Sequence, residues 1–186
     1  MDRRCLIAGC GYVGRRLAQR MRPAWRVVAL ARSPGSVAAL CAAGIETITA
    51  DLDAVHLTGD LQSVADGAAI AYLAPPPESG TGDSRMDRFL AALGEARPTV
   101  FLYMSTTGVY GDAAGAAVDE SSPIAPSNDR SRRRVAAEHV TRAWCEMRGI
   151  RWVVLRVPGI YGPHRLPLER LQRGEPALVS AASASA

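Results

Sequence analysis

The feature that most limits what this chain can fold into is a glycine-rich turn near its start, Gly9-Cys10-Gly11-Tyr12-Val13-Gly14. An apolar run at residues 5–8 precedes the turn and predicts a short buried strand. The segment after the turn places apolar side chains on one face of a helix at residues 13–21. A strand, a turn with glycines at this spacing and a helix together predict the first half of a βαβ unit.

Each glycine of the turn has a physical task in such a unit. Gly9 permits the tight turn, Gly11 lets a pyrophosphate approach the backbone, and Gly14 lets the helix pack closely against the strand. Amides at the start of the helix, at Tyr12 and Val13, then bind phosphate with the help of the helix dipole. We therefore predict that these five residues bind a dinucleotide. The alternative is an ordinary glycine-rich connection between strand and helix.

The rest of the chain alternates between predicted strands and helices. This alternation predicts an α/β fold, a Rossmann-like doubly wound parallel sheet with helices on both faces. The longest helix is expected to bury an apolar face made of Val135, Ala136, Val140, Ala143, Trp144 and Met147. Further strands are predicted at residues 25–30, 45–49, 69–74, 100–105 and 152–157, and helices at 34–41, 57–64, 86–93, 135–147 and 166–173.

Length and composition limit the domain organisation. With 186 residues, 48% of them apolar, the chain suits one domain with a sizeable core. We predict a nucleotide-binding domain over residues 1–174 and a disordered, low-complexity tail over residues 175–186. All 22 basic residues are arginine, so the chain has no lysine to form a Schiff base or to act as a general base.

The cysteines and the apolar runs favour a cytoplasmic protein. Cys5, Cys10, Cys41 and Cys145 are scattered, without a CxxC pair or a Cys/His cluster, so we predict neither a metal site nor a disulfide framework. Buried thiols in a reducing compartment are expected instead. No apolar run is long enough for a membrane span or the core of a signal peptide, so we expect no membrane partner.

The end of the second predicted strand distinguishes NAD from NADP. Enzymes that use NAD place Asp or Glu there, where the carboxylate binds the ribose 2′-hydroxyl. This chain has Arg32 and Ser33 instead, and a guanidinium suits a 2′-phosphate. The pattern favours NADP over NAD, the alternative being that Arg32 is a solvated loop residue. Asp51 and Leu52, after the third strand, are candidates to frame the adenine, and Asp51 equally fits a plain loop aspartate.

Three later segments complete an ordered set of motifs. Ser105-Thr106-Thr107-Gly108-Val109-Tyr110-Gly111 follows the fifth strand, Val135-Ala136-Ala137-Glu138 lies in the long helix, and Arg156-Val157-Pro158-Gly159-Ile160-Tyr161-Gly162-Pro163 follows the sixth strand. With the glycine turn, this set resembles the extended and atypical short-chain dehydrogenases/reductases, the NAD-dependent epimerase/dehydratase family, over residues 3–176. The resemblance implies an NAD(P)-dependent oxidoreductase, epimerase or dehydratase that acts on a sugar nucleotide or another carbonyl or alcohol.

The resemblance also implies which residues are catalytic. Thr106 matches the Ser or Thr that helps to bind the reacting oxygen. The Tyr and Lys of the family's YxxxK pair correspond to Arg130 and Arg134. Arginine stays protonated and cannot replace a phenol in proton exchange, but Arg134 can still hold the ribose or a phosphate. Arg130, Arg132 and Arg133 are candidates to bind an anionic substrate, the alternative being a solvated basic helix start.

Further family features carry over by position. Leu73-Ala74-Pro75 falls where the family chain passes the cofactor, and Pro158-Gly159-Ile160 where it approaches the nicotinamide, so both are predicted to be cofactor walls. Family members continue into a substrate domain, most of which is expected to be missing from this apparently truncated chain. They often form homodimers through their long helices, so a homodimer is a candidate assembly.

The replaced YxxxK pair leaves two functions open. One is an enzyme with a small-molecule substrate, and the other is a catalytically impaired NADP-binding module or redox sensor. Nucleic-acid binding is not predicted, because no stacking aromatic residues accompany the arginine cluster and the net charge is only +4.

Overall fold

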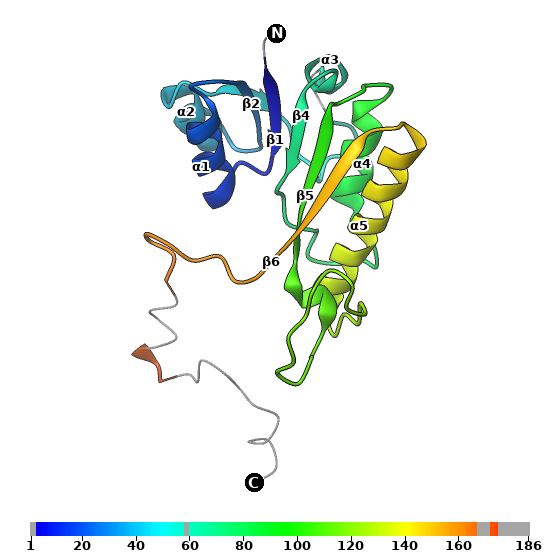
Figure 1. Cartoon of the computed structure of the whole chain (residues 1–186). Coiled ribbons are helices and arrows are strands. Elements are labelled where there is room, and N and C mark those ends of the chain that lie inside the picture. The colour runs from blue at the N-terminus through cyan, green and yellow to red at the C-terminus, as the bar shows by residue number, and fades with distance from the viewer. Residues whose placement is uncertain (1–2, 58–59, 167–171, 175–186) are drawn as a thin grey trace.

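The computed structural model describes residues 3–57, 60–166 and 172–174. Within them, six parallel strands form one sheet in the order β3-β2-β1-β4-β5-β6 (Figure 1). The strands are β1 (Arg4–Ala8), β2 (Arg26–Ala31), β3 (Glu46–Thr49), β4 (Ala69–Tyr72), β5 (Val100–Thr106) and β6 (Arg151–Val157). The helices are α1 (Tyr12–Met21), α2 (Pro34–Ala42), α3 (Leu61–Ala65), α4 (Ser84–Leu93), the 3-10 helix η1 (Thr107–Tyr110) and α5 (Asp129–Met147).

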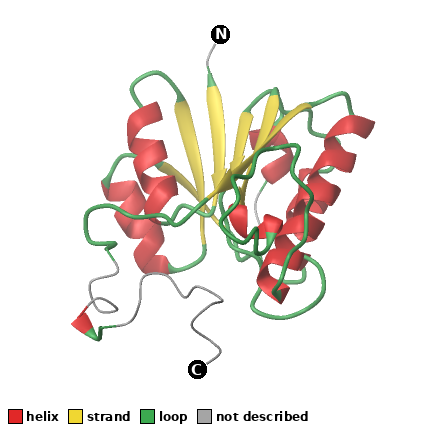
Figure 2. Ribbon diagram, turned by 60° about the horizontal axis from the view of Figure 1, so that its bottom comes forward, coloured by secondary structure: helices red, strands yellow, loops and turns green. Residues whose placement is uncertain are grey.

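Helices cover both faces of the sheet, as Figure 2 shows. Residues of α1 and α2 pack with one set of strand side chains, and residues of α3, α4 and α5 pack with the other set. The predicted doubly wound α/β fold is therefore confirmed. The strand order reverses between β1 and β4, and at such a switch point the carboxyl ends of parallel strands leave a crevice for a ligand.

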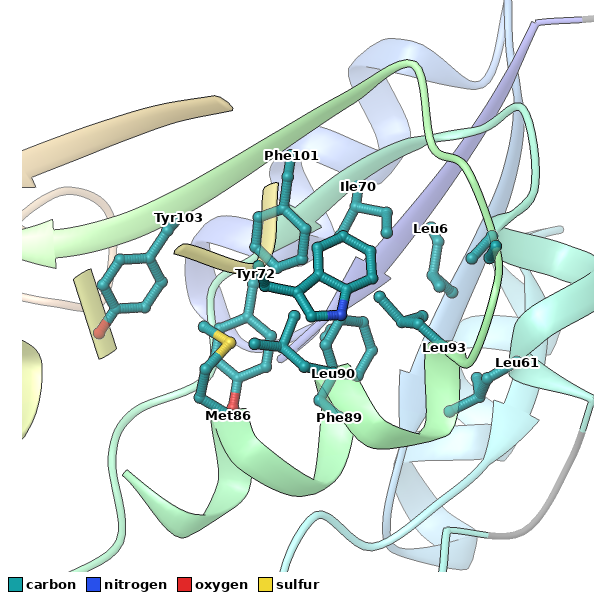
Figure 3. Packing of buried hydrophobic residues seen from close by; sticks show 14 of the residues in the cluster. Leu6, Leu61, Ile70, Tyr72, Met86, Phe89, Leu90, Leu93, Phe101 and Tyr103 are labelled. Carbon is teal, nitrogen blue, oxygen red and sulfur yellow. The ribbon is translucent and has the colours of Figure 1, made fainter. Parts of the chain in front are cut away.

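Aromatic side chains connect α4 and α5 to the sheet, and Figure 3 shows those of Tyr72, Phe89 and Phe101. The ring of Phe89 lies 5.1 Å from that of Tyr72 and 6.3 Å from that of Phe101, and Phe101 lies 6.1 Å from Trp144. Aromatic pairs at these separations stabilise a core beyond the area that they bury. The helix predicted at 86–93 is confirmed as part of α4, and its apolar face is buried at Met86, Phe89, Leu90 and Leu93.

The buried face of α5 differs from the predicted one. Among the apolar residues expected to face the core, only Trp144 is buried, and Met147 is 75% exposed. The helix instead buries polar side chains, because neighbouring strands and loops supply hydrogen-bond partners for them. Apolar periodicity does not detect such a face. The buried residues of α5 are Ser131, Arg133, Arg134, Ala137, Glu138, Thr141, Trp144 and Cys145.

Some element boundaries also differ from the predictions. β4 ends at Tyr72 rather than at residue 74, although the Leu73 amide still donates to the Ala8 carbonyl. The prolines at 75–77 have no N–H with which to continue a ladder. The fifth strand is followed directly by η1, and α3 begins at Leu61 rather than at residue 57. The predicted helix at 166–173 lies mostly outside the described residues, and the predicted tail lies wholly outside them.

The cysteines have mixed surroundings. Cys5 and Cys145 are buried as predicted, whereas Cys10 is half-buried and Cys41 on α2 is exposed. In the part of the chain that the structure describes, no three His, Cys, Asp or Glu side chains group as metal ligands would. No helix among the described residues is both long and apolar enough to cross a membrane.

Asp83 is the N-cap residue of α4 and is buried. Its negative charge therefore lowers the free energy of unfolding. One carboxylate oxygen accepts from the Met86 amide at 3.1 Å, while the other is buried without a partner among the described residues. Burial raises the pKa of Asp83, against the lowering effect of the Met86 amide and of Arg134. Because the folded state then holds the proton more tightly than the unfolded state, the charged carboxylate lowers stability once the pH rises through this pKa.

We therefore expect Asp83→Asn to increase the free energy of unfolding at pH 7, because asparagine caps a helix as well as aspartate does. The advantage over the wild type should shrink as the pH falls toward the unfolded-state pKa of about 3.9. Asp83→Ala, which removes the cap, should instead cost about 1 kcal/mol. Urea unfolding at several pH values measures all three proteins. An Asp83→Asn variant less stable than the wild type at pH 7 would contradict this account.

Candidate functional site

A cavity of about 590 Å³ lies at the carboxyl ends of the strands, beside the switch point between β1 and β4. Its walls come from the turn after β1, the end of β2, the loop after β3, the end of β4, the first turns of α5 and the segment after β6. Parallel strands bring these segments together, since their carboxyl ends meet at one edge of the sheet. Most residues predicted to bind the cofactor line this cavity.

The glycine turn has the geometry that its spacing predicts. Gly9 has a φ of +89°, and a Cβ atom there would overlap the backbone of Ala74. A Cβ atom on Gly14 would lie 2.8 Å from the Gly9 carbonyl oxygen, so glycine is required for α1 to approach the turn. A Cβ atom on Gly11 would meet no atom within 4 Å. Gly11 therefore faces open space that a ligand can enter.

The first turn of α1 is available to an anion. Gly11 is the N-cap residue, and no side chain caps the helix. Tyr12 and Val13, the first two helical residues, line the cavity. Uncapped amides at a helix N-terminus carry partial positive charge and bind phosphate groups. Arg15, one turn further along, also lines the cavity and adds a full positive charge.

Arg32 and Ser33 lie beside this turn at the end of β2. The Arg32 side chain is 66% exposed, and its Nη1 lies 3.4 Å from a carboxylate oxygen of Asp53. Ser33 is the N-cap of α2, where its hydroxyl oxygen accepts from the Ser36 amide, and Pro34 follows at the first helical position. Ser33 thus combines the role of helix cap with a place in the cavity wall.

The loop after β3 and the end of β4 form further walls. Asp51 accepts from the Asp53 amide at 2.9 Å, which orders the loop, and Leu52 packs against the core. Leu73 and Ala74 are buried beside the glycine turn. Together with Pro75, all the predicted residues of these two segments line the cavity: Asp51, Leu52, Leu73, Ala74 and Pro75.

The arginine cluster of α5 divides into two pairs. Arg130 and Arg132 are exposed, whereas Arg133 and Arg134 are each only 6% exposed. The interpretation as a solvated helix start is therefore wrong for Arg133, because carbonyl groups of another segment accept its hydrogen bonds. Arg133 donates to the carbonyls of Glu78 and Gly80. Only Arg130 and Arg134 of this cluster line the cavity.

Arg134 is held firmly by its surroundings. Its Nη1 atom donates to the Ala74 and Met104 carbonyls at 3.2 and 2.8 Å, and to the Tyr103 hydroxyl at 3.1 Å. Within the described residues, its Nε and Nη2 atoms have no hydrogen-bond partner, so they remain available to a ligand. Burial raises the pKa of Tyr103 to about 12, and this phenol is outside the cavity lining.

Thr106 lies at the end of β5 and starts η1, where its hydroxyl accepts from the Gly108 amide at 3.1 Å. It is half-buried and is not among the residues that line the cavity, although Met104, two residues earlier, is. Beside it, buried Glu138 accepts from Ser105 and from both Nε and Nη2 of Arg156. These contacts anchor α5 to the ends of β5 and β6.

The segment after β6 returns to the glycine turn. The Tyr12 hydroxyl donates to the Pro163 carbonyl at 3.2 Å, and the Arg165 guanidinium lies 5.2 Å from the centre of the Tyr12 ring. Ile160 and Arg165 therefore line the cavity. Pro158 and Gly159, predicted with Ile160 as a nicotinamide wall, are exposed and lie outside the lining.

Four charged residues of the cavity were not predicted: Arg15, Asp53, Arg85 and Arg165. Arg15 directly follows the glycine motif, and this position could have indicated it. Asp53 and Arg85 pair across 32 residues of sequence, which no local motif reports. Arg165 reaches the cavity only because Tyr12 holds the segment before it.

Comparison with known proteins identifies the family to which this chain is similar. A sequence model of the NAD dependent epimerase/dehydratase family matches residues 5–184. The chain belongs to this family. It is 37% identical to dTDP-D-glucose 4,6-dehydratase of Homo sapiens over 78 residues, and this alignment covers 42% of this chain and 22% of the human protein. It is 29% identical to an uncharacterized UDP-glucose epimerase of Bacillus subtilis over 124 residues, and this alignment covers 60% of this chain and 39% of that protein.

Solved structures show the same fold. UDP-glucuronic acid 4-epimerase from Bacillus cereus, in complex with NAD, superposes with a TM-score of 0.74 at 21% identity, over 93% of this chain and 63% of that one. A functionally unknown conserved protein from Silicibacter pomeroyi superposes with a TM-score of 0.66 at 30% identity, over 91% of this chain and 57% of that one. This member of the epimerase/dehydratase family thus spans less than two thirds of these relatives.

Proposed function

We propose that this epimerase/dehydratase family member binds NADP(H) in the cavity and uses it to transform a sugar nucleotide. One observation carries the proposal: an open Gly11 and an uncapped helix N-terminus face the same cavity as the exposed guanidinium of Arg32. The first two features suit a pyrophosphate, and the third suits a 2′-phosphate. Relatives support the cofactor class, since the Bacillus cereus epimerase is a complex with NAD.

The cavity residues fit a dinucleotide along its length. The amides of Tyr12 and Val13, with Arg15, would hold the pyrophosphate, and Asp51 and Leu52 would border the adenine. The remaining donors of Arg134 would reach the ribose or a phosphate at the far end. When bound, the nicotinamide would supply hydride transfer to or from the substrate.

A sugar nucleotide suits the charges around the cavity opening. Arg130 and Arg165 line the cavity, and both are exposed. Exposed guanidinium groups bind diphosphates through bidentate hydrogen bonds. The names of the relatives indicate the same substrate class, since these relatives are a dTDP-glucose dehydratase and UDP-sugar epimerases. Thr106 would bind the reacting oxygen, as its place in the motif implies.

A second candidate function is that of an NADP(H)-binding module without turnover. It is favoured by the replacement of a phenol and an ammonium by Arg130 and Arg134, because arginine is a poor general acid and general base. Tyr12 is the only phenol among the described lining residues, and its hydroxyl already donates to Pro163. A search for turnover with dTDP- and UDP-sugars separates the two functions, since a binding module gives tight NADPH binding and no product.

The setting proposed with this function is the cytoplasm, where a reducing environment keeps free thiols such as that of exposed Cys41 reduced. A homodimer through α5 is proposed as its assembly. Met147 is 75% exposed and Val140 is half-buried, so part of the apolar surface of this helix remains for a partner.

Arg32 provides the test of cofactor choice. Arg32→Ala is expected to weaken NADPH binding about tenfold to hundredfold, the range for losing a hydrogen bond to a charged group, while NADH binding changes little. Arg32→Asp should reverse the preference, because a carboxylate suits a ribose hydroxyl and repels a phosphate. Fluorescence titration of both cofactors gives the dissociation constants. If neither variant weakens NADPH relative to NADH, the assignment of the 2′-phosphate site is wrong.

A further inference from the structure

Three charged side chains from separate elements meet at the edge of the cavity. Arg32 follows β2, Asp53 lies in the loop after β3, and Arg85 is in the first turn of α4. Arg85 donates from Nε and Nη2 to the two oxygens of Asp53, each at 2.6 Å. Its Nη1 donates to the Pro75 and Pro76 carbonyls at 3.1 and 3.4 Å.

The pairing within this group is uneven. Arg85 holds Asp53 through a bidentate contact, the strongest geometry for a guanidinium and a carboxylate. Arg32 reaches only one Asp53 oxygen, at 3.4 Å, and its side chain is 66% exposed compared with 17% for Arg85. Arg85 is also the main cause of the lowered pKa of Asp53. The charge of Asp53 is therefore balanced by Arg85, and that of Arg32 remains available.

We propose that Arg85 sets the cofactor preference by neutralising Asp53, so that Arg32 can bind the 2′-phosphate of NADP(H). The proposal rests on the proposed cofactor site. Arg32 already makes one long contact with Asp53, at 3.4 Å. Without Arg85, the Asp53 carboxylate would draw Arg32 into a closer ion pair and repel the phosphate. It would then act as the acidic residue that NAD-binding sites place near the ribose hydroxyls. Arg32 is thus the contact residue, and Arg85 is a positioning residue that acts through Asp53.

The test is a double-mutant cycle read as the ratio of the NADPH and NADH dissociation constants. Arg85→Met is expected to weaken NADPH binding about tenfold and to leave NADH binding nearly unchanged. Asp53→Asn is expected to tighten NADPH binding. In the Arg85→Met/Asp53→Asn double variant the loss should largely disappear, because no carboxylate then competes for Arg32.

Arg85→Lys is the control that separates the effect of the positive charge from that of the guanidinium geometry. It keeps the positive charge near Asp53 but loses the planar fork, so most of the NADPH preference should remain. Urea unfolding of each variant checks that differences in binding do not reflect a loss of folding. Isolated 2′-phosphate binding is measured with adenosine 2′-monophosphate against adenosine, and this ratio should follow the same order.

Several outcomes would overturn the proposal. Equal weakening of NADPH and NADH by Arg85→Met would show that Arg85 merely anchors the loop to the Pro75 carbonyl. If Arg85→Met weakens NADPH binding equally in the wild type and in the Asp53→Asn background, an action of Arg85 through the carboxylate is excluded. Failure of the wild type to bind either dinucleotide would refute the proposed function itself, whereas tight binding with an unchanged ratio refutes only the role of Arg85.

Discussion

Replacing Gly11 with alanine is expected to remove most dinucleotide binding while leaving the stability of the fold close to that of the wild type. Gly11 has a φ of −83°, outside the left-handed region, and a Cβ atom there would meet nothing within 4 Å. The free energy of unfolding should therefore change by less than about 1 kcal/mol. The added methyl group would occupy the space through which a pyrophosphate approaches the amides of α1, so the NADPH dissociation constant should rise at least about tenfold, or 1.4 kcal/mol.

Gly9→Ala is the matched variant within the same turn. Its φ of +89° strains any other residue, and its Cβ atom would overlap the Ala74 backbone. We expect a loss of about 2–5 kcal/mol in unfolding free energy, from backbone strain and overpacking together. Urea unfolding and the rise in thermal midpoint on adding NADPH distinguish the two variants. A Gly11→Ala protein that binds NADPH as well as the wild type would show that the turn serves only the fold.

Arg156→Met is expected to give the largest loss of stability outside the glycine turn. Arg156 Nη2 lies 2.8 Å from Glu138, whose side chain is 6% exposed, and Nη1 donates to the Tyr110 hydroxyl at 2.9 Å. Removing the guanidinium would leave a buried carboxylate without its counter-charge, which costs about 3–5 kcal/mol. Urea unfolding at pH 7 measures this change. The loss would also loosen the end of β5, where Ser105 donates to Glu138 next to Thr106.

Two further variants show whether the buried charge is the cause. Arg151→Met, on the same strand, removes an exposed guanidinium with one 3.4 Å bond to the Thr99 carbonyl, and should cost no more than about 0.5 kcal/mol. Arg156→Met combined with Glu138→Leu should recover much of the stability, because no uncompensated charge remains. Equal losses for the Arg156 and Arg151 variants would refute the account.

Local patterns predicted the parts of the fold that depend on local chemistry. The strand runs and the apolar face of α4 follow a simple rule, since apolar side chains at a regular period need one common interior. The same rule failed for α5, where the buried side includes Arg133, Arg134 and Glu138. Their burial depends on partners supplied by distant segments, such as Glu78 for Arg133 and Arg156 for Glu138.

The sequence by itself determined the doubly wound fold, the family and the glycine turn, because neighbouring residues specify a strand, a turn and a helix N-terminus. Only the tertiary structure decided which arginines are solvated and which are held in place. A guanidinium is stable in the interior only where carbonyls and carboxylates surround it, as Ala74 and Met104 surround Arg134. The Arg85–Asp53 pair exists for the same reason, since the packing of α4 beside the loop after β3 brings these two charges together.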